Sequence, residues 1–300
     1  SHRAPHTSSR SRDPSRTMAD ETARLVAALR ATLDADASAR ASAEDFLAVR
    51  STEEGCLWRA LEVASSESFD AMTRQSAAVT FKNAVRKHWD PVEPDEVGAV
   101  KPRGTSEGEK AQCRTAMGGL MLRAPKLVAA QLSEALSIVC AVDFPERWEG
   151  LLPELVQRMG SAGNRDLRDV AGVLTTANAM FKRYRGATKT EELYKELKYV
   201  LDTFAKPLLE LTLELSAGLE ANVGNVEASR QLLTCLRLAC RVFFSLNSQE
   251  LPEVFEDAMA EWMGAFHKFL TYDAPAGLAS SEDEKASEVD QVKAAVCDNI

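Results

Sequence analysis

The unit from which this chain is built is seen in residues 242–257, which read Val-Phe-Phe-Ser-Leu-Asn-Ser-Gln-Glu-Leu-Pro-Glu-Val-Phe-Glu-Asp. The apolar stretch from Leu232 to Phe244 predicts one helix, and a second helix is predicted to run through Trp262. Between them lies a polar turn at 247–249. Pro252 opens the second helix, where the missing N–H of proline does no harm. The stretch therefore predicts two helices joined by a short turn.

The same pattern of helix, short turn and helix recurs along the whole chain. Pairs of amphipathic helices are predicted at 20–33 and 37–50, 54–65 and 69–89, 106–123 and 125–142, 148–160 and 166–185, 190–217 and 227–246, and 251–271 and 286–300. Each pair occupies roughly 40–50 residues, the period of HEAT-type helical hairpins. Alternating strand patterns are absent from the sequence. The expected fold class is all-α, an α-solenoid of HEAT-type helical hairpins.

The composition favours helices and argues against several kinds of partner. Of the 300 residues, 45% are hydrophobic and only 6% are aromatic, a balance typical of helical proteins. The net charge of −9 argues against nucleic acid, because phosphate neutralisation needs clustered Lys and Arg. No apolar run approaches the roughly 18 residues of a membrane span. We therefore expect no nucleic acid and no membrane among the partners, and the charge would suit a basic protein.

Neither catalytic nor metal chemistry is indicated. The six cysteines form no Cys-x-x-Cys pair, and Cys140, Cys235 and Cys240 fall in apolar helical stretches, where a free cysteine behaves as a small hydrophobe. The sequence also has no Gly-rich phosphate loop, no His-Glu-x-x-His and no Gly-x-Ser-x-Gly. We expect structural thiols in a reducing compartment, no cofactor, no metal and no enzyme activity.

Several segments interrupt the helical pattern. Residues 1–17 are rich in Arg and Ser and are expected to lie outside the fold, either as a transit peptide or as sequence upstream of a natural start at Met18. The second interpretation is favoured because no amphipathic helix is predicted before Glu21. Breaks are predicted at 90–108, 218–226 and 273–290, the last as an acidic, solvated loop. Residue 1 is not methionine and the pattern runs to Ile300, so we expect a fragment of a longer protein.

Helical wheels separate apolar from polar faces on three of these helices. On the helix at 69–89 the apolar face carries Ala77, Ala78, Phe81, Val85 and Trp89, and the polar face carries Ser76, Thr80, Asn83 and Lys87. On the helix at 125–142 it carries Ser133, Glu134 and Ser137. On the helix at 166–185 it carries Thr176 and Arg183. In a solenoid, the second helices of successive helical pairs lie side by side, and their exposed faces line one binding surface. The residues on these polar faces are therefore candidate contacts for a partner protein.

Four motifs, in this order, resemble the importin-β family of nuclear transport receptors. They are Asp34-Ala35-Asp36 followed by Arg40 and Ala43-Glu44-x-x-Leu47, then residues 78–89, then Asp143-Phe144-Pro145-Glu146-Arg147-Trp148, and then Phe181-Lys182-Arg183-Tyr184-Arg185. Each also has a purely structural interpretation: a capped helix start, an amphipathic helix, a tight corner in which Pro145 ends one helix and starts the next, and a basic helix end. The resemblance runs from about residue 21 to 299. The segment 242–270 is most similar to the members that return importin-α to the cytoplasm.

This resemblance implies a receptor that binds the GTPase Ran in its GTP state and importin-α cooperatively, and that shuttles between nucleus and cytoplasm past the FG-repeat proteins of the nuclear pore. It implies importin-β-like repeats with a Ran-binding segment over 18–185, and further repeats over 186–300. Combined with the wheels, it assigns Ran contacts to Ser76, Thr80, Asn83, Lys87, Ser133, Glu134 and Ser137. It assigns cargo contacts to Arg183 and Arg185, with Arg183 pointing away from the core.

Two alternatives remain open from the sequence. Another importin-β-family receptor would share the early repeats and differ over 242–270. A HEAT scaffold with no role in transport would share only the periodicity, and it would not need Asn83 and Lys87 on an ordered polar stripe. A chain of this length is expected to bind Ran weakly, since the complete receptors of the family are several times longer.

Overall fold

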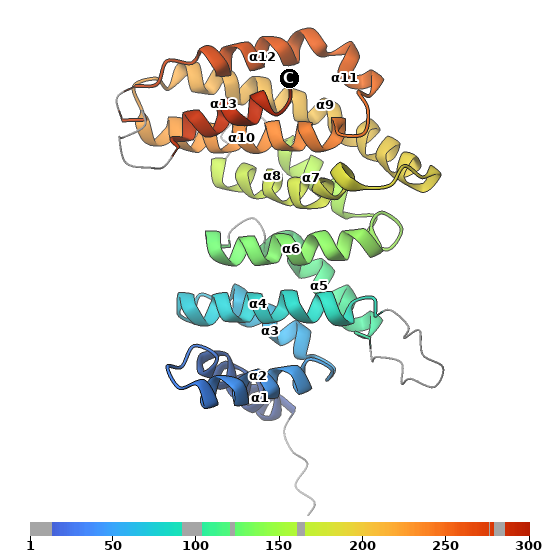
Figure 1. Ribbon diagram of the computed structural model, residues 1–300, viewed down its shortest axis with the longest axis vertical. Coiled ribbons are helices and arrows are strands. Elements are labelled where there is room, and N and C mark those ends of the chain that lie inside the picture. Colours follow the sequence, from blue (N-terminus) through green and yellow to red (C-terminus); the bar gives the residue numbers. More distant parts are fainter. Residues whose placement is uncertain (1–13, 92–103, 121–123, 161–165, 276, 279–285) are drawn as a thin grey trace, which may run out of the picture. The chain divides into compact units, whose positions relative to one another are not determined.

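The computed structural model describes residues 14–91, 104–120, 124–160, 166–275, 277–278 and 286–300, with the side chains of 14–18 left aside. These residues form thirteen α-helices and one short 3₁₀ helix, and none of the described residues lies in a β-strand (Figure 1). The predicted all-α class is confirmed. The described part of the chain includes no helix with both the length and the apolar character that a membrane crossing needs.

The helices follow the predicted pairs. In chain order they are α1 (Pro14–Ala31), α2 (Ala37–Arg50), α3 (Cys56–Ser65), α4 (Ala71–His88), α5 (Glu107–Leu120), α6 (Lys126–Asp143), α7 (Leu151–Met159), α8 (Leu167–Phe181), the 3₁₀ helix η1 (Lys182–Gly186), α9 (Glu191–Ala221), α10 (Val226–Asn247), α11 (Glu253–Asp257), α12 (Met259–Thr271) and α13 (Glu288–Cys297).

The chain divides into two compact units, residues 1–110 and 111–300. In the first unit, α1 packs against α2, α3 and α4, and α3 packs against α4. Leu29, Leu61, Phe81, Val85 and Trp89 are fully buried there. Phe81, Val85 and Trp89 were placed on the apolar face of their helix by the wheel, so the wheel of α4 is confirmed.

In the second unit, α8 lies between α6 and α10, and α10 also packs against α9 and α13. Residues 242–257 form the centre of an aromatic cluster here. The Phe243 ring centroid is 4.8 Å from that of Phe255, 4.4 Å from that of Trp262 and 5.3 Å from that of Phe266. Such pairs contribute about 0.5–1.5 kcal/mol each beyond the burial of their area. The turn at 247–249 is thus held by the aromatic side chains on both sides of it.

Polar side chains begin several helices. Asp36 accepts hydrogen bonds from the backbone N–H groups of Ser38 and Ala39 at the start of α2, as its motif predicted. Asp70 accepts from the backbone N–H and the hydroxyl of Thr73 at the start of α4. These two bonds, and then the nearby Arg30 guanidinium, lower the pKa of Asp70 to about 2. The first turns of both helices are therefore fixed by local capping rather than by packing alone.

Three predicted boundaries are wrong. Helix α1 begins at Pro14, inside the segment 1–17 that was expected to lie outside the fold. The break predicted at 218–226 is shorter, because α9 continues to Ala221. Gly218 lies inside α9, where an added Cβ would come within 3.4 Å of the Leu232 side chain on α10. The helix predicted at 251–271 is interrupted at Ala258, where α11 ends and α12 begins.

Two further expectations, one on α8 and one between α6 and α7, are corrected. Thr176 was placed on a free polar face but is fully buried, because α8 is packed between two helices, and its hydroxyl donates to the carbonyl of Gly172. Pro145 does not start the next helix; it lies in the turn between Asp143 and Leu151, after a cis peptide bond from Phe144. Most of the predicted tail and of the 90–108 loop lies outside the described residues, as do residues 276 and 279–285 of the predicted acidic loop at 273–290; α13 begins at Glu288, inside that predicted loop.

Candidate protein-binding site

A groove of about 480 Å³ opens in the first unit between α2 and α4. The end of α1 and its following turn contribute Thr32 and Leu33, and α2 with its C-terminal cap contributes Glu44, Leu47, Ala48 and Ser51. From α4 the lining consists of Met72, Gln75, Ser76, Val79, Thr80, Asn83, Ala84, Lys87 and His88. All four residues of α4 that the sequence assigned to Ran therefore line one groove.

The groove has an apolar floor because short side chains leave space between the two helices. Helix α2 packs against α1, and α4 packs against α1 and α3. Ala48 on one side and Ala84 on the other are too short to fill the gap between α2 and α4. Two large apolar side chains on the lining are unusually exposed, Leu33 at 49% and Met72 at 57%. Exposed apolar groups around a hollow of this kind are typical of a protein-binding surface.

Asn83 and Lys87 add polar groups to this apolar surface. They lie one helical turn apart on α4, and both are exposed. Within the described part of the chain, neither side chain makes a hydrogen bond or an ion pair. Their donors and acceptors are therefore available to a partner, and Lys87 gives the surface a positive charge.

Ser76 differs from its neighbours because its hydroxyl is already used. It lies 3.2 Å from the carbonyl oxygen of Leu29, to which it can donate, and 3.1 Å from the hydroxyl of Thr32. These contacts tie α4 to the end of α1. We therefore assign Ser76 mainly to the support of the groove.

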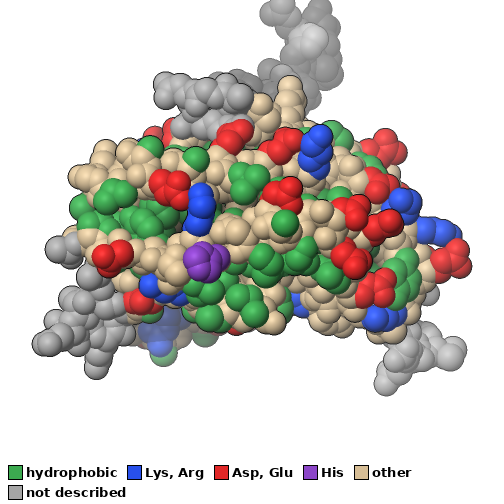
Figure 2. Space-filling model, turned by 90° about the horizontal axis from the view of Figure 1, so that it is seen from above, with side chains coloured by type: hydrophobic (Ala, Val, Ile, Leu, Met, Phe, Trp, Pro, Cys, Tyr) green, Lys and Arg blue, Asp and Glu red, His purple; other side chains and the backbone are tan. Residues whose placement is uncertain are grey.

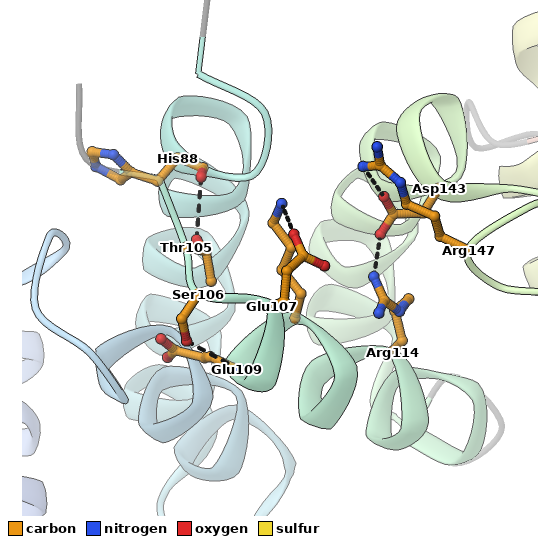
Figure 3. A network of polar contacts seen from close by, with 9 residues as sticks. His88, Thr105, Ser106, Glu107, Glu109, Arg114, Asp143 and Arg147 are labelled. Carbon is orange, nitrogen blue, oxygen red and sulfur yellow. Dashed lines mark hydrogen bonds and ion pairs between the residues drawn. The ribbon is translucent and has the colours of Figure 1, made fainter. Parts of the chain in front are cut away.

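A polar network holds the C-terminal end of α4, beside the groove (Figure 3). The carbonyl oxygen of His88 accepts from the backbone N–H of Thr105 at 2.9 Å and from its hydroxyl at 3.2 Å. The His88 Nε2 atom lies 3.1 Å from the hydroxyl of Ser51. The carboxylate of Glu109 accepts from the backbone N–H groups of Gly55 and Trp58 at 3.0 and 2.9 Å. The ends of α2, α3 and α4 are thereby fixed, so the groove is preformed.

The other three residues assigned to Ran lie on α6, in the second unit. Ser133, Glu134 and Ser137 are all half-buried. Glu134 forms an ion pair with Lys182 of η1, with an N–O distance of 2.9 Å. The structure thus brings together the residues of α4 and, separately, those of α6.

The expectation that Arg183 points away from the core is wrong. Its guanidinium forms an ion pair with Glu196 of α9, and its Nε donates to the carbonyl of Met180 at 3.2 Å. It also lies over the rings of Phe144 and Tyr184, at 6.0 and 5.0 Å from their centroids. The reason is the packing of other elements: Glu196 of α9 and the Phe144 ring contact this side chain, and the wheel of a single helix does not reveal them.

The sequence missed the α2 side of the groove. Glu44 and Leu47 were quoted within a motif that was interpreted as a capped helix and as a resemblance to the importin-β family, but neither residue was assigned a contact. The gap between α2 and α4 depends on the short side chains Ala48 and Ala84, which a wheel of a single helix does not reveal. In the described part of the chain, no group of three or more His, Cys, Asp or Glu is placed to hold a metal.

Comparison with known families matches both halves of the chain. The family model described as the importin-beta N-terminal domain matches residues 43–118, which include most of the groove. The family model described as Cse1 matches residues 180–300. Exportin-2 of Oreochromis niloticus is 40% identical over 92% of this chain, and exportin-2 of Homo sapiens is 38% identical over the same share. The chain spans only 27% of the length of either relative.

Solved structures agree with the sequence matches. The exportin Cse1 in its cargo-free, cytoplasmic state matches with a TM-score of 0.82 and 30% identity, over 92% of this chain and 28% of that one. Lph2, a bidirectional nuclear transport receptor of S. cerevisiae, matches with a TM-score of 0.59 at 16% identity over 90% of this chain and 25% of that one, which supports the fold alone. The predicted α-solenoid class and the resemblance to nuclear transport receptors are confirmed. Over 92% of its length, the chain is a homologue of exportin-2, the Cse1-type exportin of the importin-β family.

Proposed function

We propose that this chain is part of a nuclear export receptor and that the groove between α2 and α4 binds Ran in its GTP-bound state. The observation that carries the proposal is that Thr80, Asn83 and Lys87 line the same preformed groove within the importin-beta N-terminal domain match. The apolar floor offers area for burial, and the two exposed polar side chains offer specific hydrogen bonds. This combination suits a folded protein surface better than a small polar ligand.

The cargo that we propose is importin-α, as the exportin-2 homology favours. In this proposal Ran-GTP and importin-α both prefer one conformation of the helical array, so the binding of each raises the affinity for the other. Loss of the GTP-state contacts would remove the preference of Ran and release both partners. Passage through the pore would use FG-repeat proteins, and the receptor would shuttle between nucleus and cytoplasm.

The groove is tested by changing its two exposed polar residues together. Asn83→Ala with Lys87→Glu is expected to weaken the binding of Ran loaded with a non-hydrolysable GTP analogue by about tenfold or more, since two partner contacts, one of them charged, are lost. Helicity and thermal unfolding should stay unchanged, because both side chains are exposed and have no described partner.

The matched control is Lys206→Glu, which makes the same charge change on an exposed position of α9 in the second unit. It should bind Ran-GTP as the unchanged chain does. If the double variant binds Ran-GTP as tightly as the control, the groove is not the Ran site. If the unchanged chain binds no Ran in either nucleotide state, even with importin-α present, the chain is better described as a helical scaffold without a GTPase partner.

A further inference from the structure

A second pocket, remote in sequence from the groove, gathers three arginines in the second unit. It has a volume of about 370 Å³ and is formed by η1, α10 and α13. Arg185 comes from η1, and Arg237 and Arg241 lie one turn apart on α10. Phe244 contributes an aromatic ring, and Asp298 is the acidic residue of the lining. Only Arg185 was singled out by the sequence.

Arg185 is held in place by neutral partners rather than by a carboxylate. Its Nε donates to the hydroxyl of Ser245 at 3.0 Å, and one terminal nitrogen donates to the backbone carbonyl of Arg241 at 2.9 Å and to the side chain of Asn178 at 3.3 Å. Its guanidinium carbon is 4.8 Å from the centroid of the Phe244 ring. These contacts fix the orientation of the side chain and leave its charge without a paired anion.

The charge of the pocket is not balanced from within. Among the described residues, Arg237 and Arg241 form no ion pair with any carboxylate. Burial, followed by the positive charge of Arg241, lowers the pKa of both Arg185 and Arg237. The negative charge of Asp298 raises the pKa of Arg185, but this single carboxylate does not balance the positive charges of the three guanidinium groups. Grouping like charges in a half-buried pocket is unfavourable unless an anion binds there.

We propose that Arg185, Arg237 and Arg241 form a binding pocket for an acidic segment of a partner protein. Guanidinium groups present paired donors that match the two oxygens of a carboxylate. The pocket is large enough for acidic side chains, and Phe244 can pack against the aliphatic part of such a segment. Binding here is independent of the groove on α2 and α4.

The remaining surface favours a carboxylate over a nucleic acid as the ligand. The chain carries a net charge of −9, and acidic side chains are spread over the face of the molecule that Figure 2 shows. A long phosphate backbone would be repelled outside the pocket. Asp298, within the lining, also disfavours a doubly charged phosphate more strongly than a singly charged carboxylate. A short acidic peptide can place its charges in the pocket alone.

The test measures the fluorescence anisotropy of a labelled peptide of alternating glutamate and alanine, titrated with the whole chain at low salt. The unchanged chain is expected to bind it and to bind the matching glutamine–alanine peptide at least about tenfold more weakly. Arg237→Gln with Arg241→Gln should lose about tenfold or more in affinity for the acidic peptide. The control Lys206→Gln removes one charge at an exposed position of α9 and should bind as the unchanged chain does.

Three results would overturn the proposal: equal binding of both peptides, equal loss in the control variant, or binding of inositol hexakisphosphate with no binding of the acidic peptide. Arg241→Gln alone guards against a folding defect, since this side chain is exposed and its backbone carbonyl, which Arg185 contacts, is retained. It should still weaken the peptide severalfold. The groove variant Asn83→Ala with Lys87→Glu should bind the peptide normally, so failure of the Ran proposal would leave this one standing.

Discussion

Arg114 of α5 donates a hydrogen bond of 2.6 Å to the carboxylate of Asp143, which is fully buried at the C-terminal end of α6 (Figure 3). A second cation, Arg147, lies 3.7 Å from the same carboxylate, but its side chain is 58% exposed. The corner that the Asp143-Phe144-Pro145 motif predicted is therefore built around a buried ion pair. If the motif is architectural, removing this ion pair should lower the stability of the chain.

Arg114→Ala should lower the free energy of unfolding by more than Arg147→Ala does, because it removes the 2.6 Å contact that a largely buried guanidinium makes with the buried Asp143 carboxylate. Arg147→Ala should cost under about 1 kcal/mol, since an exposed pair at that distance is well screened. Urea unfolding followed by circular dichroism measures both. Equal losses in the two variants would show that burial does not decide the strength of these pairs.

Arg183 and Arg185 should behave differently although they are neighbours. Arg183→Ala removes the positively charged partner of Glu196, a carboxylate whose pKa is raised by burial and which then keeps, among the described residues, only the Tyr184 hydroxyl as a donor, and is expected to cost about 2–4 kcal/mol of stability. It should leave binding of the acidic peptide unchanged at temperatures where the variant is folded. Arg185→Ala should instead weaken the peptide. If Arg183→Ala weakened peptide binding and Arg185→Ala lowered only stability, the placement of the two side chains would be contradicted.

The six free cysteines should differ sharply in reactivity. Burial raises the pKa of Cys140, Cys235 and Cys240 to about 12, so only about one in ten thousand of these thiols is ionised at a pH of about 8. Cys56 and Cys113 are buried as well, whereas Cys297 is exposed. Iodoacetamide should therefore add one label to the native chain, at Cys297, and six after unfolding, as counted by mass spectrometry. Fast labelling of Cys140 in the native chain would contradict its burial.

Asp70 should give the first helix turn of α4 a pH dependence. Its pKa in the folded chain is about 2, below the value of about 3.9 in an unfolded chain. A lowered carboxyl pKa stabilises the fold above the unfolded value, and this contribution is lost as the pH falls through the folded value. Asp70→Asn keeps a capping oxygen but cannot titrate. The stability advantage of the unchanged chain over this variant should be present at neutral pH and should shrink toward pH about 2; an advantage that does not depend on pH would rule out the titration.

Most of the fold could be predicted because the sequence of each helix contains its own apolar periodicity and its own capping residues. Asp36 and Asp70 cap where a helix begins, and Phe81 and Trp89 fall on one buried arc. The predictions that were wrong concern residues whose environment is set by packing against other helices. Gly218 was taken as a break, yet it lies within α9 where Leu232 of α10 approaches closely. Thr176 looked like a surface residue on its wheel, but the packing of α8 on both sides buries it.

The candidate site was predictable only in part, for the same reason. The wheel of α4 found Asn83 and Lys87 correctly as exposed residues. The groove beside them exists because Ala48 and Ala84 come from different helices and leave a gap, which no single helix specifies. The arginine pocket joins side chains from η1, α10 and the end of α13, and Arg183 was misplaced because its partner Glu196 lies on another helix.

The most direct test of the central claim is the affinity of the whole chain for Ran in two nucleotide states, measured by isothermal titration calorimetry. We predict measurable binding of Ran loaded with a non-hydrolysable GTP analogue, and binding of Ran-GDP that is at least about tenfold weaker, because in the proposed function the groove is selective for the GTP-bound conformation of Ran. Equal affinity for the two states would contradict a receptor that is loaded and unloaded by GTP hydrolysis.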